Sequence, residues 1–155
     1  MRYHHTKNKG DLGLLHAQLD LAAKGYALLL PLTEHAPFDL VAYKAGSFLR
    51  VQVKYRSAVN GTIELRFRSA WADGRGTHVV PMNKDEVDVV CIYCPDTRSC
   101  YYVDPRQFRE AVTLRIAPAR NGQARGVLHA EDFGEVPTSA IDSERLLSAR
   151  RTSRP

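Results

Sequence analysis

The sequence predicts an α/β (α+β) fold in which one N-terminal helix is followed by a mixed central β-sheet. Residues 11–24 have the leucine spacing of an amphipathic helix, and the later segments are short and apolar or alternating, as strands are. A helix followed by a hairpin and further strands is typical of domains in which the helix covers one face of the sheet. With 155 residues, the chain is long enough for one domain with a buried core.

The domain organisation follows from where these patterns fade. We expect residues 1–117 to hold the core together with a basic N-terminal arm, because the apolar spacing ends near residue 117. Residues 118–155 are rich in Arg and leave little to bury towards their end. A basic, partly flexible C-terminal segment is therefore expected there.

The first elements are defined by periodicity and by their end signals. Gly25 stands where a C-cap glycine is preferred, so the helix is expected to end there. Residues 1–10 are polar and basic, and they are expected to form an arm or the lead-in to the helix. Residues 26–30 predict a buried strand, because they are apolar and are followed by Pro31.

The remaining strands are predicted from short apolar runs or strict alternation. They cover residues 38–44, 48–55, 62–68, 87–93, 100–103 and 111–116. Residues 69–77 contain Trp71 and an Asp-Gly-Arg-Gly turn and are expected to form a loop. Pro105 is expected to open a short helix.

The first two of these strands predict a β-hairpin with one register. A turn at residues 45–46 pairs Lys44 with Ser47, and it then pairs Leu40 with Val51. This register places the apolar side chains on one face, whereas a shift by one residue would mix the faces. The apolar pattern therefore fixes which residues lie opposite each other.

The same register brings three polar side chains together on the other face. Asp39 lies opposite Gln52, and Lys54 lies two residues beyond Gln52 on the same side. Asp39, the side-chain oxygen of Gln52 and the backbone oxygen of Val53 are hard ligands that suit Mg²⁺. Such an ion polarises a phosphodiester and activates water, and Lys54 would orient that water or offset negative charge. A plain Asp–Lys ion pair on a solvated sheet face explains the hairpin equally well.

Charge points to a polyanionic partner. The formal net charge is +5 and the sequence pI is about 9.3, which suits phosphate binding, although many basic proteins bind no nucleic acid. Six cationic residues near the arm, the strand ends and the loop are candidate DNA contacts. They are Lys7, Lys9, Arg56, Arg66, Arg68 and Arg75.

Several other classes of protein lose support. The chain has no P-loop, dinucleotide-binding glycine motif or nucleophile elbow, and no apolar run of membrane-spanning length. Cys91 and Cys94 would point to opposite faces of a strand, so zinc binding is not favoured. Three cysteines, an odd number, indicate free thiols and a cytoplasmic location.

The segments Pro37-Phe38-Asp39 and Val51-Gln52-Val53-Lys54 resemble the PD-(D/E)xK nuclease core. With the Thr6-Lys7-Asn8-Lys9-Gly10-Asp11 segment and the helix that follows it, the match is similar to the group I intron-associated homing endonuclease branch, which uses Q-x-K. The later segments 87–95 and 101–103 echo that branch as well. The resemblance covers roughly residues 5–105 and implies the restriction-endonuclease-like fold, with the nuclease core in residues 1–117.

The resemblance also implies roles for individual residues. Asp39 is the central metal ligand, Gln52 stands where most relatives have Glu, and Lys54 is the catalytic lysine. Asp11 falls where the family places an acid on the first helix and would supply a second carboxylate to the metal. A charge favourable to the helix N-terminus is the alternative role of Asp11. Phe38 separates the Pro and Asp that are usually adjacent.

The function implied is metal-dependent, site-specific cleavage of double-stranded DNA, with Mg²⁺ as cofactor and Mn²⁺ as a substitute. Because two strands must be cut, a homodimer or homotetramer is expected. Three alternatives remain open: a structure-specific nuclease resembling Holliday-junction resolvases, a catalytically silent DNA-binding relative, and an α+β domain with no nucleic-acid role. Loss of one usual carboxylate at Gln52 keeps the silent relative in consideration.

Overall fold

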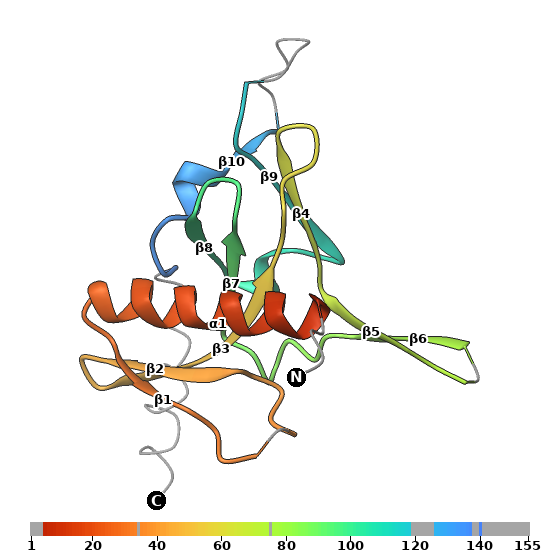
Figure 1. Ribbon diagram of the computed structural model, residues 1–155. Coiled ribbons are helices and arrows are strands. Elements are labelled where there is room, and N and C mark those ends of the chain that lie inside the picture. The colour runs from red at the N-terminus through yellow and green to blue at the C-terminus, as the bar shows by residue number, and fades with distance from the viewer. Residues whose placement is uncertain (1–4, 34, 75, 119–125, 138–139, 141–155) are drawn as a thin grey trace, which may run out of the picture.

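A computed structural model of the chain describes residues 5–33, 35–74, 76–118, 126–137 and 140 (Figure 1). In chain order the elements are α1 (His5–Ala23), β1 (Ala27–Leu29), β2 (Leu40–Lys44), β3 (Ser47–Tyr55), β4 (Thr62–Arg66), β5 (Arg68–Asp73), β6 (Gly76–Pro81), β7 (Val89–Cys94), β8 (Ser99–Val103), the 3-10 turn η1 (Pro105–Gln107), β9 (Ala111–Arg115), β10 (Leu128–His129) and the 3-10 turn η2 (Ala130–Phe133).

The elements form three layers around two apolar cores. A five-stranded sheet has the order β1-β2-β3-β7-β8, and it is mixed because β3 and β7 run parallel while its other pairs are antiparallel. α1 covers one face through Ala17 and Leu21, which belong to the same core as Leu40, Val51 and other residues of the sheet. The second sheet, β10-β9-β4, packs on the other face. The α+β class and the mixed central sheet are confirmed.

α1 ends as predicted and begins earlier than predicted. Gly25 adopts φ +82°, its N–H donates to the Ala22 carbonyl, and the Tyr26 N–H donates to the Leu21 carbonyl, which is a Schellman C-cap. The helix extends back to His5, so residues 5–10 form the helix lead-in, which was one of the two alternatives expected for them. Apolar periodicity missed this turn because its described residues are all exposed and have no face to bury.

β1 is shorter and less buried than predicted. It lies at the edge of the sheet, paired only with β2 among the described strands. Ala27 and Leu29 are exposed, and Leu28 alone of its residues packs against the core beneath α1. The prediction of a buried strand over residues 26–30 is therefore wrong, because an edge strand buries only one side.

The β2–β3 hairpin has the predicted register. Lys44 pairs with Ser47 and Leu40 with Val51, and each pair between them follows in step. The two turn residues, Ala45 and Gly46, have φ of +51° and +85°, as a two-residue primed turn requires. This register fixes where the polar residues Gln52 and Lys54 of β3 lie relative to β2.

The segment expected to be a loop forms a two-stranded antiparallel ribbon, β5–β6. Arg68 pairs with Pro81 and Asp73 with Gly76, so only the Asp-Gly-Arg-Gly turn was predicted correctly. Figure 1 shows the ribbon projecting away from the rest of the molecule. Periodicity gave no signal because neither face of the ribbon has a core to face.

The described part of the C-terminal segment packs on both cores: residues 128–133 on the second sheet, and Val136 and Ala140 on the core beneath α1. β10 pairs with β9 in parallel, and Ala130 is buried in the core beneath that sheet. The boundary after residue 117 stays a prediction. In the part of the chain that the structure describes, no helix has the length and apolar character needed to cross a membrane.

Candidate active site

Asp39 lies just before β2 and leaves the regular ladder. The Asp39 N–H donates to the Val51 carbonyl at 2.9 Å, although Val51 is already the partner of Leu40. Asp39 and Leu40 on one strand therefore both lie opposite Val51 on the other, as in a β-bulge. The predicted direct pairing of Asp39 with Gln52 is therefore wrong. The bulge turns the Asp39 carboxylate to the edge of β3, where its Oδ2 accepts a hydrogen bond of 2.6 Å from the Val53 N–H.

Gln52 has an amide oriented by a single contact. Its Nε2 donates to the Pro37 carbonyl at 3.2 Å. Its Oε1 is buried and has no hydrogen-bond partner. An unpaired buried carbonyl oxygen is uncommon, because leaving it unpaired costs about 1–3 kcal/mol. Gln52 therefore presents a free oxygen close to the residue that binds Asp39.

Lys54 is a half-buried ammonium on the same face of β3 as Gln52. Burial lowers its pKa below the ordinary value, the negative charge of Asp39 acts in the opposite direction, and the positive charge of Arg56 adds to the lowering. Lys54 is therefore within electrostatic reach of Asp39. The structure brings Asp39, Gln52 and Lys54 to one place at the start of the hairpin, as the sequence predicted.

Asp11 lies on the exposed N-terminal half of α1. Gly13, two residues further on, is buried, and a Cβ there would lie 3.5 Å from the Tyr55 Cβ and 3.7 Å from the Val53 Cγ1. α1 thus passes directly over the residue whose N–H binds Asp39. The described contacts do not join Asp11 to the other three predicted catalytic residues.

A partly buried ion pair beside the site was not predicted. Arg50 donates to Asp88 through Nε and Nη2 at 2.9 and 2.8 Å, and the Arg50 N–H binds the same carboxylate at 2.8 Å. Burial raises the pKa of Asp88, but the hydrogen bonds and charge of Arg50 outweigh this effect and hold it below the ordinary value. In the sequence, the only sign of this ion pair was Asp88, a single charged residue within the apolar run 87–93.

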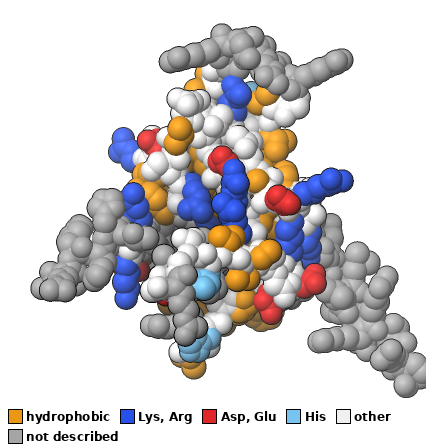
Figure 2. Space-filling model, turned by 90° about the vertical axis from the view of Figure 1, so that its right-hand side faces the viewer, with side chains coloured by type: hydrophobic (Ala, Val, Ile, Leu, Met, Phe, Trp, Pro, Cys, Tyr) orange, Lys and Arg blue, Asp and Glu red, His pale blue; other side chains and the backbone are white. Residues whose placement is uncertain are grey.

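The predicted DNA-contacting residues fall into two groups. Lys7, Lys9 and Arg56 lie near α1 and the end of β3, where the Lys9 Nζ stands 5.8 Å from the centroid of the Tyr55 ring. Arg66 and Arg68 lie where the β5–β6 ribbon leaves the body, and Arg75 lies outside the described residues. Figure 2 shows Lys and Arg side chains gathered on the face from which the ribbon projects.

The oxygen donors present fit a hard divalent cation. Asp39 supplies a carboxylate, and the unpaired Gln52 Oε1 supplies a neutral oxygen. Mg²⁺ commonly takes one or two carboxylates and keeps several waters. A zinc site does not fit, because Cys91 and Cys94 pack in different cores, and within the described residues no three His, Cys, Asp or Glu side chains form a cluster.

A helix on one face of a mixed sheet, with Asp, Gln and Lys at one hairpin, defines a nuclease core. A profile of the PD-(D/E)XK endonucleases matches residues 4–136, and the chain belongs to this family. The fold is also that of a bacterial homing endonuclease, I-Ssp6803I, with a TM-score of 0.67, 20% identity and coverage of 97% of this chain and 98% of that chain. No curated protein matches the chain. The predicted resemblance to the PD-(D/E)xK nucleases is confirmed, and the fold is shared with a homing endonuclease.

Proposed function

We propose that the protein is a metal-dependent, site-specific endonuclease that hydrolyses phosphodiester bonds in double-stranded DNA. The observation that carries the proposal is the unpaired, buried Gln52 Oε1 on the residue before Val53, whose N–H binds the Asp39 carboxylate, with Lys54 within electrostatic reach of Asp39. An isolated Asp–Lys ion pair would leave that amide oxygen unexplained. Family membership supports the same chemistry.

Asp39, Gln52 and Val53 would hold the cation through oxygen atoms. The Val53 N–H binds Asp39, and because the N–H and C=O of one strand residue point to the same edge, the Val53 carbonyl faces the same edge as Asp39. Mg²⁺, with Mn²⁺ as a substitute, would polarise the scissile phosphate and lower the pKa of a bound water. Gln52 is neutral, so binding of the ion should be weak until phosphate oxygens complete the site.

Lys54 would stabilise the charge that develops on the phosphate oxygens during hydrolysis. A cation placed before the reaction in a half-buried site acts with little screening and little reorganisation. Asp39 holds the ammonium in its charged form against the effect of burial. Asp11 would add a second carboxylate, directly or through water, from the part of α1 that lies over Val53.

The substrate-binding surface would combine both groups of cations. Lys7 and Lys9 lie on α1, and Arg56 directly follows β3. Arg66 and Arg68 lie at the root of the ribbon, and Arg75 is kept as a candidate on the sequence alone. A single site cuts one strand, so a homodimer or homotetramer would be needed to cut both. The similar solved structure is a homing endonuclease, which favours a homing-type over a junction-resolving enzyme.

The test is cleavage of pooled long genomic fragments and of a synthetic four-way junction, with Mg²⁺ or Mn²⁺ and with chelator. Wild type is expected to produce discrete ends in rare fragments, and Asp39→Asn to bind DNA without cutting it. Cutting of the junction alone would assign the resolvase-like alternative. Binding by both proteins with no cutting of any substrate would overturn the catalytic proposal.

A further inference from the structure

The β5–β6 ribbon has no structural partner in the described part of the chain. β5 and β6 pair with each other and with no other strand. Val79 and Val80 point to opposite faces of the ribbon, and they are 47% and 49% exposed, so at these two residues each face is about half open to solvent. An isolated two-stranded ribbon is at best marginally stable in water. Its retention therefore points to a partner outside the chain.

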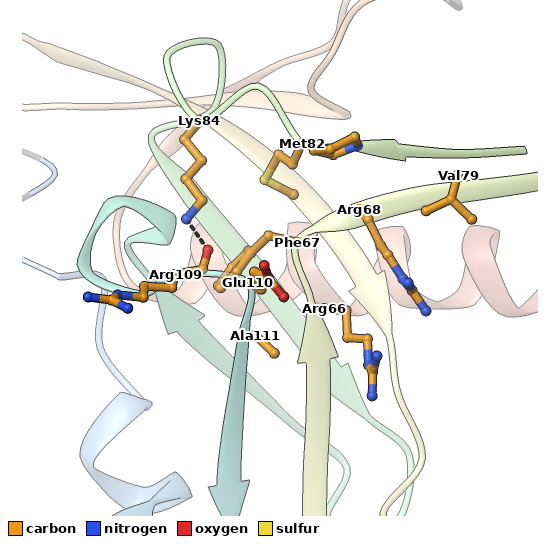
Figure 3. Close-up of a pocket in the computed structure, with 10 residues that line it drawn as sticks. Arg66, Phe67, Arg68, Val79, Met82, Lys84, Arg109, Glu110 and Ala111 are labelled. Carbon is orange, nitrogen blue, oxygen red and sulfur yellow. Dashed lines mark hydrogen bonds between the residues drawn. The ribbon is translucent and has the colours of Figure 1, made fainter.

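The root of the ribbon is cationic. Arg66 ends β4 and Arg68 begins β5, so the two alternate with the buried Phe67 and lie on one side of the chain. Figure 3 shows both guanidinium groups on the same side of the pocket at the root, a cavity of about 520 Å³. Arg68 has no ion-pair partner among the described residues, whereas Arg66 binds Glu64 at 2.7 Å.

Lys84 has a structural role in the same pocket and is not available to a ligand. Its Nζ donates to the backbone carbonyls of Phe108 and Arg109 and lies 5.0 Å from the centroid of the Phe67 ring. The Arg109 guanidinium points away from the two arginines of the root (Figure 3). The charge offered to a partner at the root is therefore that of Arg66 and Arg68.

We propose that the β5–β6 ribbon enters the major groove of duplex DNA, with Arg66 and Arg68 bound to the backbone phosphates at the edge of the groove. The major groove is about 12 Å wide and admits a two-stranded β-ribbon. Cations at the root of such a ribbon would meet the phosphates that border the groove, where they position the protein without reading sequence. This inference rests on the proposed DNA-cleaving function and assigns the reading of the target to a separate part of the molecule.

Disulfide trapping tests the placement of the ribbon. Thr77 of β6 is exposed on the ribbon, and Thr113 of β9 is an exposed strand threonine on the second sheet. Cys91, Cys94 and Cys100 are buried, so a cysteine introduced at either position is the reactive thiol of the described chain. Thr77→Cys and Thr113→Cys would be made in the Asp39→Asn background. Each would be reacted, without metal, with three-turn duplexes that carry one thiol tether on cytosine N4, in the major groove, or on guanine N2, in the minor groove.

Thr77→Cys is expected to cross-link several-fold faster to the major-groove tether than to the minor-groove tether, and Thr113→Cys to react slowly with both. Equal rates for the two positions, or disulfide-linked protein dimers in place of DNA adducts, would overturn the inference. Because trapping needs no hydrolysis, a protein that cross-links but never cuts would retain the inference and lose the proposed function. A protein that cuts DNA but cross-links equally to the two tethers would retain the proposed function and lose the inference about the ribbon.

The salt dependence of DNA binding tests whether the arginines at the root of the ribbon bind phosphates. Replacing an arginine that binds a phosphate is expected to make the plot of log affinity against log salt shallower by about 1. Arg68→Gln should show this change on an unmodified three-turn duplex. Arg98→Gln, which removes the same charge from the exposed turn between β7 and β8, should show a smaller change. Equal slopes for the two variants would remove Arg68 from the interface.

Discussion

Lys54 carries a charge at a position where the fold disfavours it. Because burial lowers its pKa, the folded protein binds this proton less readily than the unfolded chain does. The charge therefore destabilises the fold at pH below the folded pKa, and stability rises as the pH increases from there towards the ordinary value of 10.5. A residue retained at such a cost is typical of an active site.

Lys54→Met should therefore stabilise the protein at pH 7 by ~0.5–2 kcal/mol and abolish cleavage. The free energy of unfolding in urea, measured at pH 7 and at pH 9, should increase between the two values in wild type more than in the variant. A variant that is less stable than wild type at pH 7 would show that Lys54 makes a net favourable interaction and would contradict this account.

Gln52 sets how strongly the site holds a cation. Gln52→Glu adds a carboxylate beside Asp39 but loses the donor that binds the Pro37 carbonyl. Without metal the variant should be less stable by about 1–3 kcal/mol, because the Pro37 oxygen loses its partner and two carboxylates repel. With Mg²⁺ its melting temperature should rise by more than that of wild type, since only the folded state binds the ion. If Mg²⁺ shifts neither melting temperature, the assignment of these oxygens to a metal fails.

The β3–β7 pair is the element that holds the site in place. Arg50 and Asp88 join the two strands two residues before Gln52, and the Asp88 side chain is only 13% exposed. Asp88→Asn should lower the free energy of unfolding by about 1–3 kcal/mol, because it removes the carboxylate that accepts three hydrogen bonds from Arg50. Cleavage should fall along with stability, and Asp85→Asn, an exposed neighbour, serves as the control.

The same pair predicts a dependence on acid. The pKa of Asp88 is lowered in the fold, so its contribution is present above the ordinary value of 3.8 and is lost as pH falls through the folded pKa. Wild-type stability should therefore drop below about pH 4 more steeply than that of Asp88→Asn, as measured by urea unfolding at several pH values. Parallel curves for the two proteins would show that the carboxylate has no such role.

The β5–β6 ribbon should be removable without loss of the core. The Met82 N–H donates to the Phe67 carbonyl at 2.9 Å, so the two ends of the ribbon already meet. Replacing residues 69–80 by Asn-Gly, which favours a two-residue turn, should change the free energy of unfolding by less than about 1 kcal/mol. Duplex binding, measured by fluorescence anisotropy, should weaken greatly. A large loss of stability would show that the ribbon supports the core.

Elements with a face to bury were predictable from the sequence, and the others were not. The hairpin register followed from apolar pairs such as Leu40 and Val51, because a one-residue slip would expose them. The ribbon was mistaken for a loop because no core imposes alternation on it. The convergence of Asp39, Gln52 and Lys54 followed from the sequence, whereas their catalytic roles stay a prediction. The bulge did not follow, because it depends on backbone hydrogen bonds that the side-chain pattern does not encode.

At the scale of the whole molecule, α1 is apolar on two sides. Its inner residues, Ala17 and Leu21, are fully buried, while Leu15 and Leu19 are 63% and 70% exposed on the outer side. Neighbouring large apolar side chains exposed on one surface often mark a site of protein–protein contact. The outer side is therefore the surface on which we expect two copies of the chain to meet in the proposed oligomer.

Leu15→Lys with Leu19→Lys should convert the oligomer into a monomer, as measured by light scattering during size-exclusion chromatography. The helix should stay folded, because its inner residues are unchanged. Leu32→Lys, at a fully exposed leucine outside α1, should leave the mass unchanged. A wild-type protein that is monomeric at micromolar concentration would contradict the expectation.

The isolation of the ribbon from both cores has an evolutionary consequence. Substitutions on an exposed ribbon change folding stability little, whereas those beneath α1 or in the hairpin register are selected against because they unfold the protein. A lineage that carries this fold is therefore free to drift at residues 69–80 while the hydrolytic centre stays fixed. Related proteins would therefore keep the same cleavage reaction and differ in their target sequence through substitutions in the ribbon.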